Sequence, residues 1–270
     1  MEKTFQVKEF LKKSFKKTQE NYFNFLQIFL VYFVTIIIFQ LAVGPTSKEL
    51  PVLSFVISLV MAFIMVVFSL DLLKYYLALK RNEKVSFSDF FKNFGDIVQD
   101  TKLWLNYLGG GLLSGLVIML GFMIFVVPGV ILTFALLPMM LLIVDKNYKI
   151  LDAFKISFKL TKGYRNKIFL TYLAFFALTV LCLAIPYLIL SFTYNFEIIA
   201  IILGAIILLV YGFMALFSGI LISSIYDFLY ENYDEKTSLA KPVETSLTEV
   251  EESEETDTTE DSLDDEKEDN

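Results

Sequence analysis

The sequence predicts an all-α, polytopic membrane protein with six transmembrane helices and three cytoplasmic amphipathic helices. Three observations predict this class. The chain of 270 residues is 56% hydrophobic with a mean hydropathy of +0.62, whereas soluble domains are normally less than half apolar. Several uncharged stretches are as long as a membrane is thick, and lysine and arginine gather on one side of the predicted spans.

Each predicted span is an apolar stretch of the length that a membrane requires. A helix rises about 1.5 Å per residue, so about 20 apolar residues cross a hydrocarbon core roughly 30 Å thick. The six spans are expected at about residues 22–43, 51–73, 103–127, 130–144, 168–190 and 198–225. The first is longer than the apolar region of a typical signal peptide, so we expect it to be retained as a span.

The third and fourth spans come from one uncharged stretch, residues 103–144. As a single helix this stretch would extend about 63 Å, close to two crossings of the core. Pro128-Gly129 is a strong turn signal, so we predict the turn between the two spans there. The fourth span is short, and Pro138 is expected to kink it. A re-entrant hairpin is the alternative for this pair of segments.

The distribution of basic residues predicts the orientation of the chain. With six spans and a cytoplasmic N-terminus, the cytoplasmic segments carry 22 lysine and arginine residues, and the outer loops carry only Lys48. This asymmetry is the one that the positive-inside rule describes. We therefore expect a multi-pass protein with both termini in the cytoplasm.

Composition divides the chain into three segments. Residues 1–20 form a basic amphipathic N-terminal segment, residues 21–233 form the six-helix membrane domain, and residues 234–270 form an acidic tail. The tail has 16 acidic residues, 3 lysines and no aromatic residue, so it cannot bury enough apolar surface to fold alone. We expect a disordered, solvating tail, and a docking arm for a basic cytosolic partner is the alternative.

Three cytoplasmic segments, residues 7–17, 87–98 and 148–162, place apolar and basic residues on opposite helix faces. In the last of them, Leu151, Phe154 and Phe158 share one face. Such helices lie in the membrane interface with their lysines toward anionic head groups. The candidates for head-group contact are Lys149, Lys155, Lys159, Lys162, Lys8, Lys12 and Lys16. Anchoring of the loops is the simpler role for these segments, and specific recognition of lipid is the sharper hypothesis.

The first and third of these segments resemble one another. Ser14-Phe15-Lys16-Lys17-Thr18 matches Ser157-Phe158-Lys159-Leu160-Thr161 in four of five positions. Each segment is followed by an aromatic-rich span. Together with the middle segment, this pattern suggests three units, each made of an amphipathic helix and a transmembrane hairpin.

A block within residues 128–163 resembles a known group of proteins. Its residues are Pro128-Gly129-Val130, Ile143-Val144-Asp145-Lys146 and the run DAFKISFKLTKG that ends at Gly163. They resemble uncharacterised prokaryotic multi-pass proteins that are similar to the membrane domain of glycerophosphoryl diester phosphodiesterases. The resemblance implies a fold and a location in the prokaryotic plasma membrane. It does not extend to catalysis, because the soluble catalytic barrel of that enzyme is missing and its chemistry relies on histidines, which this chain lacks.

Asp71 is the ionisable residue closest to the interior of a predicted span. It follows 20 uncharged residues and precedes Lys74 by three positions. Ionisable residues inside membranes are costly and are often functional. We expect the span to end near Asp71, with a local Asp71–Lys74 pair. The alternative is a deeper position, in which Asp71 would serve a proton or cation path.

Two patterns of small residues permit close approach between helices. They are Gly111-x-x-x-Gly115 and Ala215-x-x-x-Gly219. We expect them to serve packing within the bundle, and contact between copies of the chain is the alternative.

The leading functional expectation is a non-enzymatic membrane module that organises lipid or partner proteins at the inner leaflet. The chain has no histidine and one cysteine, which excludes the common zinc sites and a histidine-based triad. We therefore expect no catalytic, cofactor or metal-binding residue, and no nucleic-acid partner. A transporter or channel component is the alternative, based on the repeat, the proline-interrupted span and Asp71.

Overall fold

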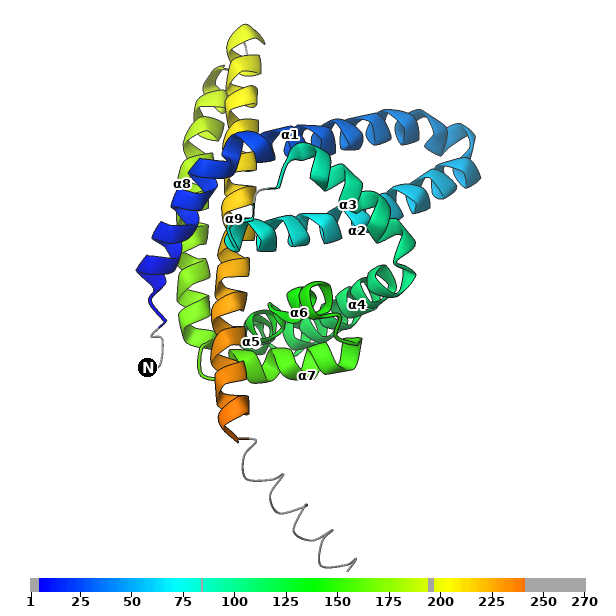
Figure 1. Cartoon of the computed structure of the whole chain (residues 1–270). Helices are drawn as coiled ribbons and strands as arrows, with labels where there is room; N and C mark the ends of the chain where they lie inside the picture. The colour runs from blue at the N-terminus through cyan, green and yellow to red at the C-terminus, as the bar shows by residue number, and fades with distance from the viewer. Residues whose placement is uncertain (1–4, 84, 194–196, 241–270) are drawn as a thin grey trace, which may run out of the picture. The chain divides into compact units, whose positions relative to one another are not determined.

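The chain is an all-α, multi-pass membrane protein, as the sequence predicts. A computed structural model describes residues 5–83, 85–193 and 197–240 (Figure 1). Across these residues the regular structure is helical, and six helices are long and apolar enough to cross a membrane. In chain order the helices are α1 (Val7–Glu49), α2 (Pro51–Lys80), α3 (Phe87–Gln99), α4 (Thr101–Ile124), α5 (Val126–Leu136), α6 (Met139–Lys146), α7 (Ile150–Thr161), α8 (Arg165–Thr193) and α9 (Glu197–Ala240).

The chain divides into two compact units. One comprises Thr4–Asp227, and the other comprises Met1–Lys3 with Phe228–Asn270. In the second unit the structure describes the last part of α9, where the Asn232 side chain donates to the carbonyl of Phe228 at 2.8 Å. This helix continues to Ala240 and so includes the start of the predicted acidic tail. The rest of the predicted tail, residues 241–270, lies outside the described residues.

α1 joins the first basic segment and the first predicted span in one continuous helix. Figure 1 shows this helix changing direction in its first half. Polar side chains there bond back to carbonyls one turn earlier: Thr18 Oγ1 donates to Ser14 at 2.8 Å, and Asn21 Nδ2 donates to Lys17 at 2.9 Å. Because such bonds compete with the backbone ladder, they often bend a helix. The basic segment and the span therefore run in different directions, although no loop separates them.

The core between α1, α2 and α3 is aromatic. α1 and α2 form a hairpin, and α3 packs against α2 (Figure 1). The buried rings of this core belong to Phe25, Phe29, Phe68, Tyr75, Tyr76 and Phe90. The rings of Phe68 and Phe90 meet edge to face with centroids 5.2 Å apart, which is a favoured aromatic geometry. The fully buried Phe90 thus holds α3 on α2.

The turn between α4 and α5 lies at Phe125, so the prediction of a turn at Pro128-Gly129 was wrong. Phe125 is the single extended residue between the two helices. Pro128 lies in the first turn of α5, where a missing backbone N–H removes no helical hydrogen bond. Gly129 brings α5 against α4, because a Cβ there would overlap the ring of Phe122. The proline and glycine therefore start and pack the helix that follows the turn.

The tip of the α4–α5 hairpin exposes only apolar side chains. Residues 122–127 read Phe-Met-Ile-Phe-Val-Val, and Phe125 is 74% exposed. α4 contains 24 residues, which corresponds to about 36 Å and suits a full crossing. The tip thus has no polar side chain to hold it in water, whether the pair crosses fully or forms the alternative re-entrant hairpin.

The fourth predicted span consists of two helices, α5 and α6, which are interrupted at Leu137 and Pro138. This confirms the expected effect of Pro138, which cannot donate a backbone hydrogen bond. The span Val126–Lys146 contains an apolar stretch of 18 residues, of which 44% are buried. This share is larger than in the other candidate spans among the described residues. Interrupted backbone is tolerated at membrane depth where protein covers it. The burial of this span therefore accounts for its broken helix.

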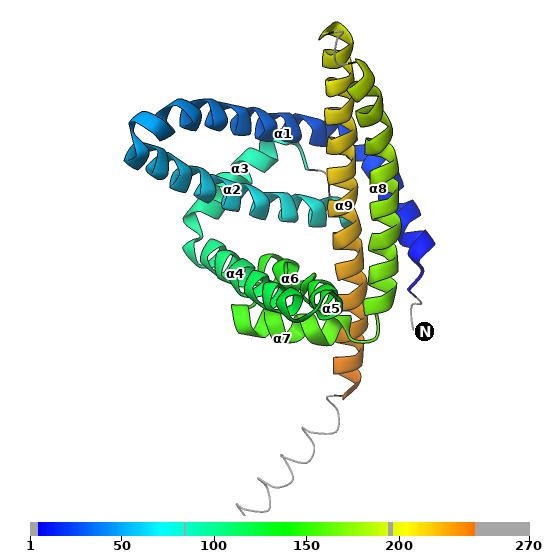
Figure 2. The same ribbon diagram turned by 180° about the vertical axis from the view of Figure 1, so that it is seen from behind.

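α7 packs against α5 and α6 and covers the interruption. Ser157 Oγ donates to the carbonyl of Ala135 at 2.7 Å, and Thr161 Oγ1 lies 3.5 Å from the same oxygen. Ala135 belongs to the last turn of α5, where carbonyls lack partners within the helix. Figure 2 shows α7 beside α4, α5 and α6 from behind. The small polar residues of α7 thus satisfy a backbone group that the proline break leaves free.

α8 and α9 form the last hairpin and lie side by side in both views (Figures 1 and 2). The ring of Tyr76 on α2 packs directly against Gly219 on α9, so that a Cβ on Gly219 would overlap the ring. Ala215-x-x-x-Gly219 therefore serves packing within the bundle, as predicted. In the other small-residue pattern, a Cβ on Gly111 would lie 3.0 Å from Met140 Cε, whereas a Cβ on Gly115 would meet no atom within 4 Å.

Gly219→Ala is expected to destabilise the protein by about 1–3 kcal/mol, because the added methyl group would displace the ring of Tyr76. The matched control is Gly115→Ala, where the methyl group meets open space. This control should leave stability unchanged or raise it by up to about 1 kcal/mol, since alanine favours a helix over glycine. The free energy of unfolding, measured by denaturant titration in mild detergent, checks both values. Equal effects of the two substitutions would contradict the packing role of Gly219.

Candidate functional site

The seven candidate lysines all lie at the surface of the protein. They are Lys8, Lys12 and Lys16 on α1, and Lys149, Lys155, Lys159 and Lys162 on or beside α7. The structure brings these two basic segments to the same end of α8. α1 packs against α8, and the ring of Phe5 lies 6.1 Å from that of Tyr164, between α7 and α8. The first and third basic segments are therefore neighbours.

The face of α7 that contacts protein differs from its predicted apolar stripe. The buried face consists of small or polar residues together with one leucine: Ala153, Ser157, Leu160 and Thr161. Leu151 is 65% exposed, and Phe154 and Phe158 are half-buried. Apolar periodicity does not distinguish a face that meets protein from one that meets lipid. The predicted stripe therefore stays partly exposed beside the lysines, while the other face holds the helix to the bundle.

The repeated sequence of the first and third segments has the same burial pattern and the same threonine bond in both, although Ser157 Oγ donates to Ala135 and Ser14 Oγ has no partner among the described residues. Ser14 and Thr18 are buried on α1, as Ser157 and Thr161 are on α7. In each segment the threonine hydroxyl donates to the serine carbonyl, at 2.8 Å in α1 and 3.0 Å in α7. The serine and threonine face the bundle, and the lysine between them faces outward. This equivalence supports the predicted relation between the two units.

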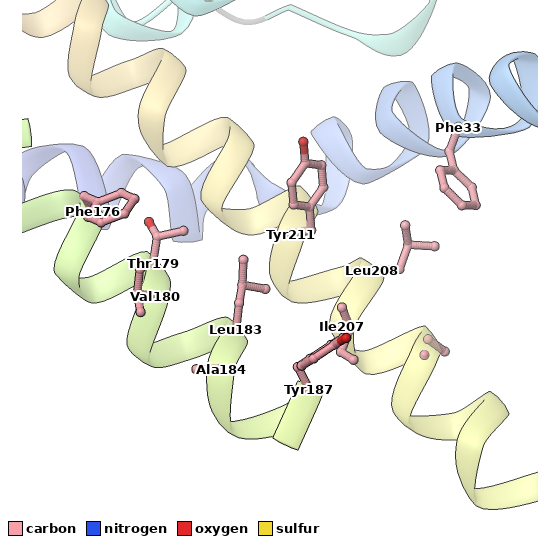
Figure 3. Close-up of a pocket in the computed structure, with 12 residues that line it drawn as sticks. Phe33, Phe176, Thr179, Val180, Leu183, Ala184, Tyr187, Ile207, Leu208 and Tyr211 are labelled. Carbon is pink, nitrogen blue, oxygen red and sulfur yellow. The ribbon is translucent and has the colours of Figure 1, made fainter. Parts of the chain in front are cut away.

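An apolar groove of about 970 Å³ runs between α8 and α9 (Figure 3). Phe176 and Tyr187 line it from α8, Leu208 and Tyr211 line it from α9, and Phe33 lines it from α1. No sequence pattern predicts this groove, because its residues have the same apolar character as the other surfaces of the predicted spans. Its volume lies at the upper end of the range for small-molecule sites, roughly 300–1,000 Å³.

The groove lies away from the lysines along α8. Phe176 follows Arg165 by 11 residues, which places it about 16 Å along the helix. This distance is about half the thickness of a hydrocarbon core. A lipid whose head group contacted α7 would therefore reach the groove only with the ends of its chains. The groove and the lysines are separate features.

Five charged side chains form an ion cluster: Lys80, Arg81, Asp145, Lys146 and Asp227. Arg81 binds Asp145 with two bonds, Nη1 to Oδ1 at 2.7 Å and Nη2 to Oδ2 at 2.9 Å. Arg81 Nη2 also lies 3.3 Å from Asp227 Oδ1, and Lys80 Nζ lies 3.6 Å from Asp227 Oδ2. Two-bond pairing of a guanidinium with a carboxylate fixes both the distance and the orientation of the groups. The cluster therefore joins the end of α2 to α6 and α9.

The ion cluster is partly sheltered from solvent. The Asp145 side chain is 8% exposed and that of Arg81 is 38% exposed. The Tyr226 hydroxyl donates to Asp145 Oδ2 at 3.0 Å. The hydrogen bonds with Asp145 raise the pKa of Arg81 further above its usual range, so the guanidinium stays charged at every physiological pH.

A lysine of α1 satisfies backbone carbonyls at the same end of α2. Lys17 Nζ of α1 donates to the carbonyls of Leu79 and Lys80, at 2.8 and 2.6 Å. These carbonyls belong to the last turn of α2, where no later helical N–H reaches them. A cation at a helix C-terminus also interacts favourably with the helix dipole. Lys17 therefore serves the fold here, and its ammonium group is engaged.

The sequence did not predict the ion cluster. Arg81 is separated from Asp145 by 64 residues and from Asp227 by 146 residues. Local spacing carries no signal for pairs so far apart. Asp145 belongs to the block with the family resemblance, and Asp227 follows directly after the sixth predicted span. The available signal was that Asp145 and Asp227 each lie at the lysine-rich end of a predicted span.

Asp71 is covered by protein, whereas the preferred prediction gave it a local pair with Lys74 at the end of the span. α2 continues for nine residues beyond Asp71, to Lys80, and the side chain is 1% exposed. Among the described residues it forms no ion pair, so the expected Asp71–Lys74 pair is absent. The reason is that α3 packs over this part of α2 and buries it. Burial by protein differs from the deeper membrane position of the alternative, which stays a prediction.

Comparison of the chain with protein-family models, with curated proteins and with solved structures gives no match. The resemblance of residues 128–163 to the phosphodiesterase membrane domain therefore stays a prediction. In the part of the chain that the structure describes, no three histidine, cysteine, aspartate or glutamate side chains gather as metal ligands.

Asp145→Asn is expected to destabilise the protein by about 1–3 kcal/mol, because it weakens two charge-assisted hydrogen bonds of Arg81. The matched control is Glu9→Gln, whose carboxylate pairs with Lys13 at the surface of α1 and is 50% exposed. That change should cost less than about 0.5 kcal/mol, since solvent screens exposed pairs. Unfolding titrations in mild detergent measure both. A cost for Asp145→Asn no larger than that of the control would show that the cluster does not stabilise the fold.

Proposed function

We propose that the protein is a non-catalytic module of the prokaryotic plasma membrane that organises lipid at the inner leaflet. The observation that supports it is the arrangement of α7, which is fixed to the bundle while its lysines stay exposed and its aromatic stripe stays partly exposed. The positive-inside asymmetry of the sequence places these lysines on the cytoplasmic side, with both termini.

The attachment of α7 gives its lysines a defined position. Ser157 and Thr161 hold the helix against Ala135, so Lys155 and Lys159 project from a rigid surface beside the start of α8. Phe154 and Phe158 lie next to them with ring centroids 5.0 Å apart. Aromatic rings of this kind favour the head-group level of a membrane. Each lysine near an anionic leaflet contributes about 1 kcal/mol of attraction.

The neighbouring segment of α1 supports the same role. Its repeat places Ser14 and Thr18 against the bundle and Lys16 outward, as in α7. Two fixed basic helices therefore flank one end of α8. The acidic tail carries the opposite charge, and anionic lipid repels it. A basic cytosolic partner for the tail is a separate hypothesis, and residues 241–270 lie outside the described structure.

The double substitution Lys155→Gln with Lys159→Gln is expected to reduce the enrichment of anionic lipid around the protein about tenfold or more. Two lysines at about 1 kcal/mol each account for this factor. The full-length protein is reconstituted in vesicles of phosphatidylcholine and phosphatidylglycerol, and the lipid that copurifies with it is measured by mass spectrometry. High salt should weaken the enrichment by the wild type, because the attraction is electrostatic.

The matched control for this experiment is Lys92→Gln with Lys102→Gln. These lysines are also exposed, on α3 and α4, and their substitution changes the net charge by the same amount. The control should retain most of the enrichment. An equal loss in both double variants would indicate a general effect of charge, and no loss in either would contradict the proposal.

A second candidate function, a transporter or channel component, is favoured by one observation, the burial of Asp71 without an ion pair. If this function holds, reconstituted vesicles should show a cation or proton flux that Asp71→Asn abolishes. Flux that is unchanged in this variant would remove the residue on which the candidate depends.

A further inference from the structure

A polar cavity of about 260 Å³ lies between the second half of α2 and the start of α3. Its floor consists of buried residues: Asp71, Tyr75 and Phe90. Its mouth carries the exposed side chains of Glu83, Asp89 and Asn93. Among the described residues that line it, Lys74 is the one basic residue and three are acidic. The cavity therefore favours a cation at its floor and presents one positive charge at its wall.

Two buried polar atoms at the floor have no partner. Asp71 Oδ2 and the Tyr75 hydroxyl form no hydrogen bond in the described structure. Tyr75 is 3% exposed, and it follows Asp71 by one helical turn, so both side chains lie on the same face of α2. A buried carboxylate without a partner is costly. A ligand that donates hydrogen bonds and carries positive charge would satisfy both atoms at once.

The aromatic side chains of the cavity limit the chemical class of ligand that it can bind. The rings of Tyr75 and Phe90 meet nearly at right angles, with centroids 6.3 Å apart, beside the carboxylate of Asp71. Aromatic rings together with a carboxylate suit an organic ammonium group, which has N–H donors and is attracted to ring faces. We infer that this cavity binds a primary ammonium group, with Asp71 and Tyr75 as its hydrogen-bond partners.

The depth of the cavity points to a phospholipid with an ethanolamine head group as the source of this ammonium. Asp71 lies 20 residues along α2 from Pro51, about 30 Å, which is the thickness of a hydrocarbon core. The cavity floor therefore lies at the level of lipid head groups. Such a head group joins an ammonium to a phosphate, and Lys74 at the wall supplies the charge that a phosphate requires. This choice of source rests on the proposed lipid function, whereas the ammonium chemistry rests on the cavity alone.

The test uses the full-length protein in nanodiscs of phosphatidylcholine with added phosphatidylethanolamine. Native mass spectrometry measures which lipid stays bound after release from the disc. The wild type should retain phosphatidylethanolamine over phosphatidylcholine, because the quaternary ammonium of the latter has no N–H donor. Asp71→Asn should reduce this preference about tenfold or more, since a charge-assisted hydrogen bond is lost. The matched control, Asp96→Asn on the exposed face of α3, should retain it.

Free ethanolamine distinguishes the two sources of the ammonium. For a lipid ligand, Lys74→Gln should weaken retention of phosphatidylethanolamine and leave the weak binding of free ethanolamine unchanged. Binding of free ethanolamine that depends on Asp71, without any lipid preference, would assign a soluble amine to the same cavity. Equal retention of both lipids together with no Asp71-dependent binding of ethanolamine would overturn the inference. None of these outcomes depends on Lys155 or Lys159, so the test is independent of the anionic-lipid experiment.

A thermal unfolding measurement shows whether the Asp71→Asn variant has a folding defect. Asparagine has nearly the volume of aspartate and removes an unpartnered buried charge, so Asp71→Asn should unfold at the same or a higher temperature than the wild type without ligand. Added ethanolamine or its phospholipid should raise the unfolding temperature of the wild type and leave that of the variant unchanged. Stabilisation of both proteins to the same extent would also overturn the inference.

Discussion

The guanidinium of Arg81 contacts carboxylates from two other parts of the chain, and each partner in this contact belongs to a different hairpin. Arg81 follows the α1–α2 hairpin, Asp145 ends the segment that returns from α4, and Asp227 belongs to α9. Lipid is as apolar as the side chains of the spans, so the hydrophobic effect does not hold helices together within a membrane. Directional bonds of this kind therefore act together with van der Waals packing to arrange the three hairpins, and Tyr76 against Gly219 adds close packing nearby.

The break at Pro138 and the attachment of α7 are parts of one arrangement. The proline interrupts the span, which leaves the Ala135 carbonyl at the end of α5, and Ser157 supplies the missing hydrogen bond. Ala135 is fully buried, and a buried carbonyl without a partner costs free energy, which the Ser157 bond removes. The helix that satisfies it is also the helix that carries the lysines of the proposed lipid contact. The position of that contact thus follows from a backbone requirement inside the bundle.

Hydropathy and charge predicted the class of fold and the six spans, because both signals depend only on local composition. They did not predict details that depend on contacts between distant segments. Phe125 forms the turn in place of Pro128-Gly129, since a proline in the first helical turn is as compatible with a helix as with a turn. The buried face of α7 was missed because lipid and protein both accept apolar residues. The ion cluster and the isolation of Asp71 arise from packing that no local pattern encodes.

The apolar tip of the α4–α5 hairpin has a consequence for how this hairpin is positioned in the bilayer. Charged side chains anchor a loop at the aqueous boundary, because moving them into hydrocarbon is costly. The tip around Phe125 has no such anchor, so moving it a few ångströms along the membrane normal exposes no charge to hydrocarbon. Its depth is then set by the contacts of α4 and α5 with α2, α3, α6, α7 and α8. In a thinner or thicker bilayer, the middle hairpin would keep its place relative to the protein while the lipid adjusts around it.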